Sequence, residues 1–187
     1  MPKTNNVKSR HRFLIPNKYN FCVHEVARPV YQVWLNCRVG HKHINLSGVD
    51  DYHKPPIRLI ETKTGFQYYY AFERMQNIMQ FEANDRQPFI ISEHKSWHIK
   101  KMAWAEVLQL AFIRDVNHAL LWHTLKSDCP TTILLELMQT ASLTRKDYTE
   151  FVGIELDHLE YQQRQIVAQQ ESLGLPNDMS WANESSE

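Results

Sequence analysis

GFQYYYAFERMQNI, residues 65–78, contains the change of periodicity that decides the predicted fold. Three consecutive tyrosines at positions 68–70 favour a strand, because bulky aromatic side chains suit a pleated surface. From Met75 onward the apolar residues recur at Ile78 and Met79, which is the spacing of a helix. The stretch therefore predicts a strand that gives way directly to a helix.

The charged pair Glu73-Arg74 lies at this predicted transition. Backbone N–H groups at a helix start commonly bind anions, and arginine offers bidentate donors that suit a phosphate group. We predict that Arg74 contacts a phosphate with Tyr70 beside it. Glu73 is predicted to orient Arg74 or to help hold a divalent ion, so Glu73 and Arg74 are the candidate catalytic pair. The alternative is an ion pair at the surface with a structural role.

The segments around this unit predict an α+β fold. Gly65 supplies the positive φ that a short hairpin loop requires, so the apolar runs before and after it are predicted to pair. The predicted strands, which share one mixed sheet, are residues 30–37, 56–62, 66–72 and 88–92. A helix is expected from Arg74 to about Ala83, and helical spacing runs from beyond Ser96 to about Leu125. The fold class is α+β, a mixed sheet with packed helices and a helical C-terminal part.

Charge is distributed unevenly although Lys+Arg and Asp+Glu both number 21. Residues 1–24 contain basic side chains and no acid, and acidic residues accumulate after Arg164, where no Lys or Arg follows. Basic and acidic ends of this kind are expected to be mobile. The predicted regions are a basic arm over residues 1–20, an α/β core over 21–126, a helical part over 127–174 and an acidic tail over 175–187. The arm is predicted to bind DNA electrostatically through Lys8, Arg10 and Arg12.

The cellular compartment is predicted from cysteine usage and hydropathy. Three cysteines without a CxxC motif favour a reducing cytosol. No stretch approaches the roughly 20 apolar residues that a membrane span needs, and no signal-peptide core is present. We expect a cytoplasmic protein without membrane insertion.

A group of metal-ligating side chains occurs before the hairpin. His41 and His43 are followed by Asp50, Asp51 and His53. Carboxylates and imidazoles are ligands for Mg²⁺ or Zn²⁺, so Asp50, Asp51 and His53 are candidate metal ligands. Chance clustering is the alternative, because the chain contains 10 histidines.

Residues 144–164, TRKDYTEFVGIELDHLEYQQR, have helix-turn-helix spacing. Thr149 takes the small position and Gly153 the turn. The second helix is acidic, and only Gln162, Gln163 and Arg164 suit contacts to base edges. A helical hairpin that packs on the domain is therefore the preferred interpretation, and a DNA-binding helix-turn-helix is the alternative.

PPIRLIETKTGFQYYYAFERMQNI followed by QPFIISE resembles the ParB/sulfiredoxin-like superfamily in order and spacing. The resemblance covers roughly residues 30–95. Arg74 matches the phosphate-facing arginine of the superfamily and Glu73 its acidic neighbour, whereas Ala71 or Phe72 stands where a glycine is usual. No cysteine accompanies the motif, which excludes sulfiredoxin-type chemistry.

In length and composition the chain is similar to plasmid fertility-inhibition proteins of the oncogenic-suppression (Osa) type within this superfamily. That resemblance implies a block of conjugative or T-DNA transfer at the coupling protein and transfer ATPase of a type IV secretion system. It also implies ATPase and nuclease activity, with ATP and Mg²⁺ as cofactors and single-stranded or plasmid DNA as a partner. The alternatives are a non-enzymatic DNA-binding plasmid regulator, which would use residues 144–164, and a protein-interaction module, which would use residues 161–170.

Overall fold

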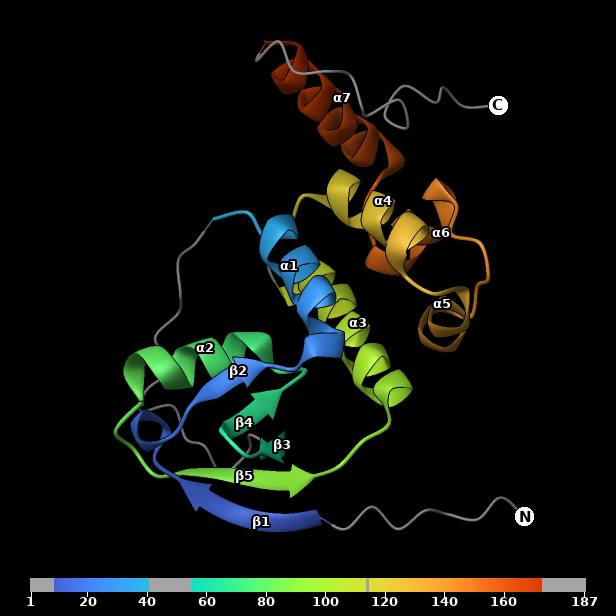
Figure 1. The fold of residues 1–187 in the computed structure, drawn as a ribbon. Coiled ribbons are helices and arrows are strands. Elements are labelled where there is room, and N and C mark those ends of the chain that lie inside the picture. Colours follow the sequence, from blue (N-terminus) through green and yellow to red (C-terminus); the bar gives the residue numbers. More distant parts are fainter. Residues whose placement is uncertain (1–8, 41–54, 114, 173–187) are drawn as a thin grey trace, which may run out of the picture. The chain divides into compact units, whose positions relative to one another are not determined.

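The computed structural model describes residues 9–40, 55–113 and 115–172 (Figure 1). The chain divides into two compact units. The first comprises Met1–Leu35 and Gly40–Leu108, and the second comprises Asn36–Val39 and Gln109–Glu187. The first unit holds the strands and is α+β, and the second is helical.

Five strands form one mixed sheet in the order β1-β5-β3-β4-β2 (Figure 1). Their bounds are β1 Ser9–Leu14, β2 Phe21–Val23, β3 Ile57–Thr62, β4 Gly65–Tyr68 and β5 Gln87–Ser92. β1 pairs with β5 and β3 with β4 in antiparallel fashion, whereas β2 pairs with β4 and β3 with β5 in parallel. The predicted α+β class with a mixed sheet is confirmed.

The neighbouring interior strands β3 and β5 alternate between buried and more exposed side chains. Ile57 and Leu59 are buried, and the intervening Arg58 is exposed. Because successive strand residues point to opposite faces, one face of the sheet carries the core and the other carries Arg58. The buried strand residues are Leu14, Ile57, Leu59, Phe66, Tyr68, Phe89 and Ile91.

The hairpin between β3 and β4 was predicted correctly. Thr62 pairs with Gly65 across a two-residue turn, and Gly65 has φ +152°. A Cβ on Gly65 would lie 2.2 Å from the backbone oxygen of Asn20, which accepts the N–H of Phe66. Gly65 is therefore required both by its backbone conformation and by the close approach of the segment before β2.

The predicted strand at residues 30–37 is wrong, because these residues belong to helix α1, Arg28–Cys37. Pro29 suits the first turn of a helix. Val30, Trp34 and Cys37 are buried at intervals of four and three residues, which is the helical period. The β-branched and aromatic content of the segment favoured a strand, but its apolar spacing is that of a helix.

Two other boundaries differ from the prediction. β4 ends at Tyr68 instead of continuing to residue 72, and helix α2, Phe72–Phe81, begins two residues before Arg74. The chain turns at Ala71, which has left-handed dihedral angles of φ 54° and ψ 40°. Residues 9–14, predicted as part of a mobile arm, form the edge strand β1.

Helices pack on the sheet within the first unit. The N-terminal part of α1, the whole of α2 and the part of α3, Ser96–Ile113, that precedes Gln109 belong to this unit. Short 3₁₀ turns occur at Pro16–Lys18 and Glu25–Ala27. The helical side chains in this core are Val30, Trp34, Phe72, Met75, Ile78, Ile99, Ala103, Trp104 and Val107.

The second unit contains four further helices, α4 His118–Asp128, α5 Thr131–Met138, α6 Arg145–Val152 and α7 Leu156–Ser172. The helical run predicted to continue to about Leu125 is interrupted before α4, where the Asn117 side chain caps Leu120 N–H. Thr144 and Asp147 form a capping box at the start of α6. The core of this unit includes Leu121, Trp122, Ile133, Leu134, Tyr148 and Leu159.

All three cysteines are free thiols, of which Cys22 is exposed and the other two are buried. Within the described part of the chain, none of the helices combines the length and the apolar composition that a membrane crossing requires.

Candidate functional site

The junction between β4 and α2 already contains an anionic partner. The carboxylate of Glu106, on α3, accepts the backbone N–H groups of Ala71 and Phe72. Burial raises the pKa of Glu106, and the two backbone hydrogen bonds lower it. These two N–H groups of the helix start are therefore satisfied by a side chain of the chain itself.

Tyr70 links this junction to β3. Its hydroxyl oxygen accepts the backbone N–H of Arg58 at 2.8 Å. Burial raises the pKa of Tyr70, whereas the hydrogen bond from Arg58 and the charges of Arg58 and Arg74 lower it. Because Glu106 also acts on Tyr70, the structure brings Tyr70 and Arg74, both predicted from the sequence, together with two residues that were not predicted.

The charge of Arg58 also acts on a pair of histidines. The rings of His94 and His98 stack with centroids 4.6 Å apart, and His94 also contacts Tyr69 at 5.6 Å. Ser92 Oγ hydrogen-bonds His94 Nε2 at 2.9 Å. These contacts fix the position of His94 between the end of β5 and the start of α3.

Both histidines favour the neutral imidazole. Burial lowers the pKa of His94, as do the charges of His98 and Arg58. Burial also lowers the pKa of His98, as do the charges of Lys101 and Arg58. Arg58 therefore disfavours protonation of both stacked rings, and Lys101 adds to this effect at His98.

These residues form what we call the Arg58 cluster, which belongs entirely to the first unit. Its members are Arg58, Tyr70, Arg74, His94, His98, Lys101 and Glu106. The permanent charges are three cations against one carboxylate, and the carboxylate is bonded to backbone N–H groups. The cluster is therefore a region of excess positive charge with two neutral imidazoles and a phenol, a set of donors that suits a multiply charged oxyanion.

The pair Glu73-Arg74 lies in the first turn of α2. The Arg74 guanidinium donates to the backbone carbonyl of Pro55. Neighbouring residues on a helix do not share a face, so Glu73 and Arg74 point in different directions. The joint catalytic role of this pair remains a prediction.

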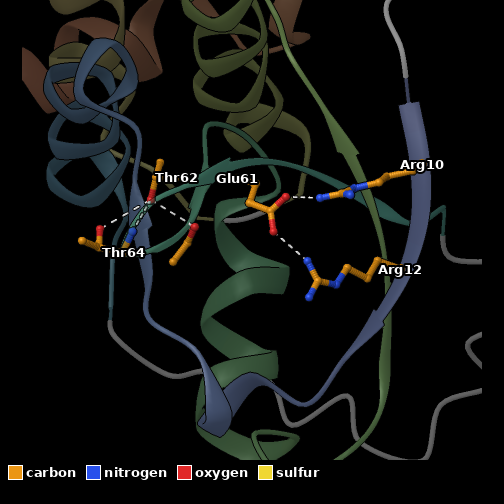
Figure 2. A network of polar contacts seen from close by, with 6 residues as sticks. Arg10, Arg12, Glu61, Thr62 and Thr64 are labelled. Carbon is orange, nitrogen blue, oxygen red and sulfur yellow. Dashed lines mark hydrogen bonds and ion pairs between the residues drawn. The ribbon is translucent and has the colours of Figure 1, made fainter.

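Two of the predicted DNA-binding arginines are engaged in ion pairs. Figure 2 shows Glu61, on β3, between Arg10 and Arg12, on β1. Arg12 Nη1 lies 2.7 Å from Glu61 Oε1, and the Arg12 guanidinium also lies over the ring of Phe66 at 5.5 Å. The sheet order places β5 between these strands, so both arginines reach across β5. Lys8 lies outside the described residues, and DNA binding by this segment stays a prediction.

The predicted metal ligands Asp50, Asp51 and His53 also lie outside the described residues. Within residues 9–40, 55–113 and 115–172, no group of three or more His, Cys, Asp or Glu side chains is arranged to hold a metal ion.

The helix pair predicted from residues 144–164 is present as α6 and α7. Gly153 has φ +74° at the end of α6, and Thr149 and Leu159 are buried. Two of the three side chains predicted to read bases serve the packing of the unit. Gln162 Oε1 accepts the N–H groups of His118 and Ala119 at 2.6 and 3.3 Å, and Gln163 is buried. These contacts belong to helices that pack within the second unit, as a helical hairpin would.

Sequence reasoning missed five members of the cluster. His94, His98 and Lys101 follow one another at intervals of four and three residues, and this helical spacing was an available signal. Arg58 resembled an ordinary exposed position of an alternating strand. Glu106 offered no local signal, because its partners lie on a different element.

The sequence matches no protein-family model, and a comparison with curated proteins finds no match. Among solved structures, the chain is similar to the C-terminally truncated chromosome-partitioning protein ParB from Caulobacter crescentus, complexed with CTP-γ-S. The two share 12% sequence identity over 94% of this chain and 89% of that chain, with a TM-score of 0.29. A likeness at this level carries no argument about the function of this chain.

Proposed function

We propose that the Arg58 cluster binds a phosphate group of a nucleotide or nucleic acid. The observation that carries the proposal is the position of Arg58, which acts electrostatically on Tyr70, His94 and His98 from a single exposed strand position. Arg58 and Arg74 come from different elements and both act on the Tyr70 phenol. Two guanidinium groups near one phenol supply the charge-assisted donors that a phosphate requires.

The contacts to the phosphate come from side chains in this proposal. Glu106 occupies the N–H groups of Ala71 and Phe72, so the start of α2 does not offer them to a ligand. The guanidinium of Arg58 contacts the phosphate. Tyr70 and Arg74 position the phosphate beside it. Glu106 holds the β4–α2 junction in place and repels anions from the helix start itself.

A sharper role follows from the resemblance of the chain, in length and composition, to fertility-inhibition proteins of the Osa type. We propose that the chain blocks conjugative or T-DNA transfer by acting on ATP and DNA at the coupling protein of a type IV secretion system. Asp50, Asp51 and His53 are the proposed ligands of Mg²⁺, which would supply charge neutralisation beside the phosphate. This role rests on the sequence pattern and on the charge of the Arg58 cluster.

Titration calorimetry of the full chain with ATP, and separately with a single-stranded oligonucleotide, tests the phosphate proposal. Arg58→Gln is expected to weaken binding about tenfold or more, because it removes a charge-assisted contact. The backbone N–H that bonds Tyr70 is retained in this variant, so the junction stays intact. Arg86→Gln is the matched control, because Arg86 lies over the ring of Phe13 and is not part of the cluster. Wild-type affinity in Arg58→Gln, or equal loss in Arg86→Gln, contradicts the proposal.

Transfer assays test the sharper role. The chain expressed in donor cells is expected to lower the frequency of plasmid transfer, and Arg58→Gln is expected to restore it. Incubation of purified protein with plasmid DNA, with ATP and with Mg²⁺ or EDTA, tests turnover directly. Undiminished plasmid transfer in cells that contain the folded wild-type protein would contradict the fertility-inhibition role. The phosphate-binding proposal would be unaffected, because calorimetry tests it separately.

A further inference from the structure

The histidine pair of the Arg58 cluster is arranged so that protonation is disfavoured in the absence of an anion. The two rings lie 4.6 Å apart, and two imidazolium ions at that distance repel each other strongly. The permanent cation Arg58 acts on both rings, and Lys101 acts on His98. The protein thus holds two titratable rings in a position that penalises their charged forms.

Within residues 9–40, 55–113 and 115–172, the groups that contact the pair or shift its pKa carry no compensating negative charge. Ser92 from β5 hydrogen-bonds His94 through a neutral hydroxyl. Tyr69 and Tyr70, from the β4–α2 connection, are neutral phenols whose pKa values are raised by burial. The carboxylate of the cluster, Glu106 on α3, is bonded to the start of α2 and acts on Tyr70. In the described part of the chain, no carboxylate is among the groups that shift the pKa of either ring.

We propose that phosphate binding at the Arg58 cluster is coupled to proton uptake by the His94–His98 pair, which makes the affinity for a phosphate-bearing ligand rise as the pH falls. This inference rests on the phosphate-binding function proposed above and adds its regulation. A bound phosphate places negative charge beside Arg58 and the two rings. It therefore favours the imidazolium form that the free protein disfavours, and protonated imidazole offers the ligand an additional N–H donor.

The direction of the coupling follows from linkage. If a bound ligand raises the affinity of the protein for a proton, protonation raises the affinity of the protein for the ligand by the same factor. In the free protein, the pKa values of both rings lie below the ordinary value of 6.5, so the neutral form of each ring is favoured at and above this pH. In the complex the phosphate raises them. Proton uptake on binding is therefore expected at pH values between the lowered pKa of the free protein and the raised pKa of the complex, and it vanishes on either side of this window.

The mechanism assigns different tasks to the members of the cluster. Arg58 and Lys101 provide charge that is independent of pH, so a basal affinity persists at high pH. His94 and His98 add affinity only when one of them is protonated. Ser92 holds His94 through Nε2, which leaves the other ring nitrogen of His94 and both nitrogens of His98 for the proton and the ligand.

The test is calorimetry of the full chain with ATP and with a single-stranded oligonucleotide that lacks terminal phosphates, at pH 8, 7 and 6. Each titration is repeated in two buffers of different ionisation enthalpy, which reports the protons taken up. The double variant His94→Asn/His98→Asn retains polar side chains but does not titrate. Since ATP itself titrates in this range, the readout is the difference between wild type and the double variant. His11→Asn is the control, because His11 is exposed on β1 and outside the cluster.

The expected result is that wild-type affinity rises about tenfold more than that of the double variant between pH 8 and pH 6. Wild type also takes up more protons per bound ligand, and His11→Asn behaves as wild type. Binding with equal pH dependence and equal proton uptake in wild type and the double variant overturns the coupling and leaves the phosphate site standing. Failure of wild type to bind either probe at every pH overturns the phosphate function and the coupling together.

Discussion

Glu106, on α3, accepts the backbone N–H of Ala71, the residue that joins β4 to α2. The neighbouring N–H of Phe72 bonds the same carboxylate. A sheet strand and two helices are thereby fixed at one point, which is also the edge of the Arg58 cluster. The side chain that performs this task is on a helix that sequence reasoning treated only as core.

Glu106→Ala is expected to lower the free energy of unfolding by about 2 kcal/mol, because two backbone donors lose their acceptor. Glu106→Gln is expected to cost clearly less, since the amide oxygen still accepts an N–H. Urea unfolding followed by far-UV circular dichroism measures both. Glu93→Ala, at an exposed position, is the control and is expected to change stability by less than about 0.5 kcal/mol. Equal losses of stability in Glu106→Ala and Glu93→Ala would contradict a stabilising role of the hydrogen bonds from Ala71 and Phe72 to Glu106.

Ala71→Gly is expected to leave the free energy of unfolding unchanged or to raise it by up to about 1 kcal/mol. Ala71 has φ 54°, a conformation that costs an L-residue about 1–2 kcal/mol and costs glycine little. The matched control is Ala105→Gly within α3, where right-handed helical geometry makes glycine unfavourable by about 1 kcal/mol. Equal losses for the two substitutions in thermal unfolding would contradict the assigned geometry at Ala71.

Tyr148→Phe is expected to destabilise the helical unit by about 1–2 kcal/mol. The Tyr148 hydroxyl is buried and hydrogen-bonds His118 Nδ1 at 2.9 Å, so its removal leaves a buried ring nitrogen without this partner. Tyr161→Phe is the comparison, because Tyr161 is an exposed side chain of α7. Chemical unfolding distinguishes them, and a Tyr148→Phe variant as stable as Tyr161→Phe would contradict the buried hydrogen bond.

Acid is expected to weaken the same unit through His118. Burial lowers the pKa of His118 and the charge of His158 lowers it further, so the folded state disfavours the imidazolium relative to the unfolded chain. The contribution of neutral His118 to the free energy of unfolding is therefore fully present above pH 6.5. It is lost as the pH falls through the folded-state pKa. His118→Gln is expected to reduce the fall in unfolding free energy between pH 7 and pH 5. An undiminished fall in the variant would assign the acid sensitivity to other groups.

The sequence predicted those parts of the fold that depend on local rules. The hairpin around Gly65 was predictable because a two-residue turn demands a backbone angle that glycine tolerates. Residues 30–37 were misassigned because composition was given more weight than the spacing of Val30, Trp34 and Cys37, which local reasoning had available.

The site was only partly predictable for a different reason. Arg74 and Tyr70 stood in a recognisable strand-to-helix pattern, but Arg58 and Glu106 reach them from other elements through tertiary contacts. An exposed arginine on an alternating strand and a glutamate within an apolar helix carry no local sign of their partners. Such contacts become visible only when the strand register and the packing of α3 are known.

Backbone amide NMR of the full chain during titration with ATP tests the central claim most directly. The account predicts saturable chemical-shift changes at Arg58, at Tyr70–Arg74 and at His94–His98, with the α6–α7 amides unchanged. Shift changes confined to β1 around Arg10 and Arg12, or to α6 and α7, with the Arg58 cluster unaffected, would contradict a phosphate site at the Arg58 cluster.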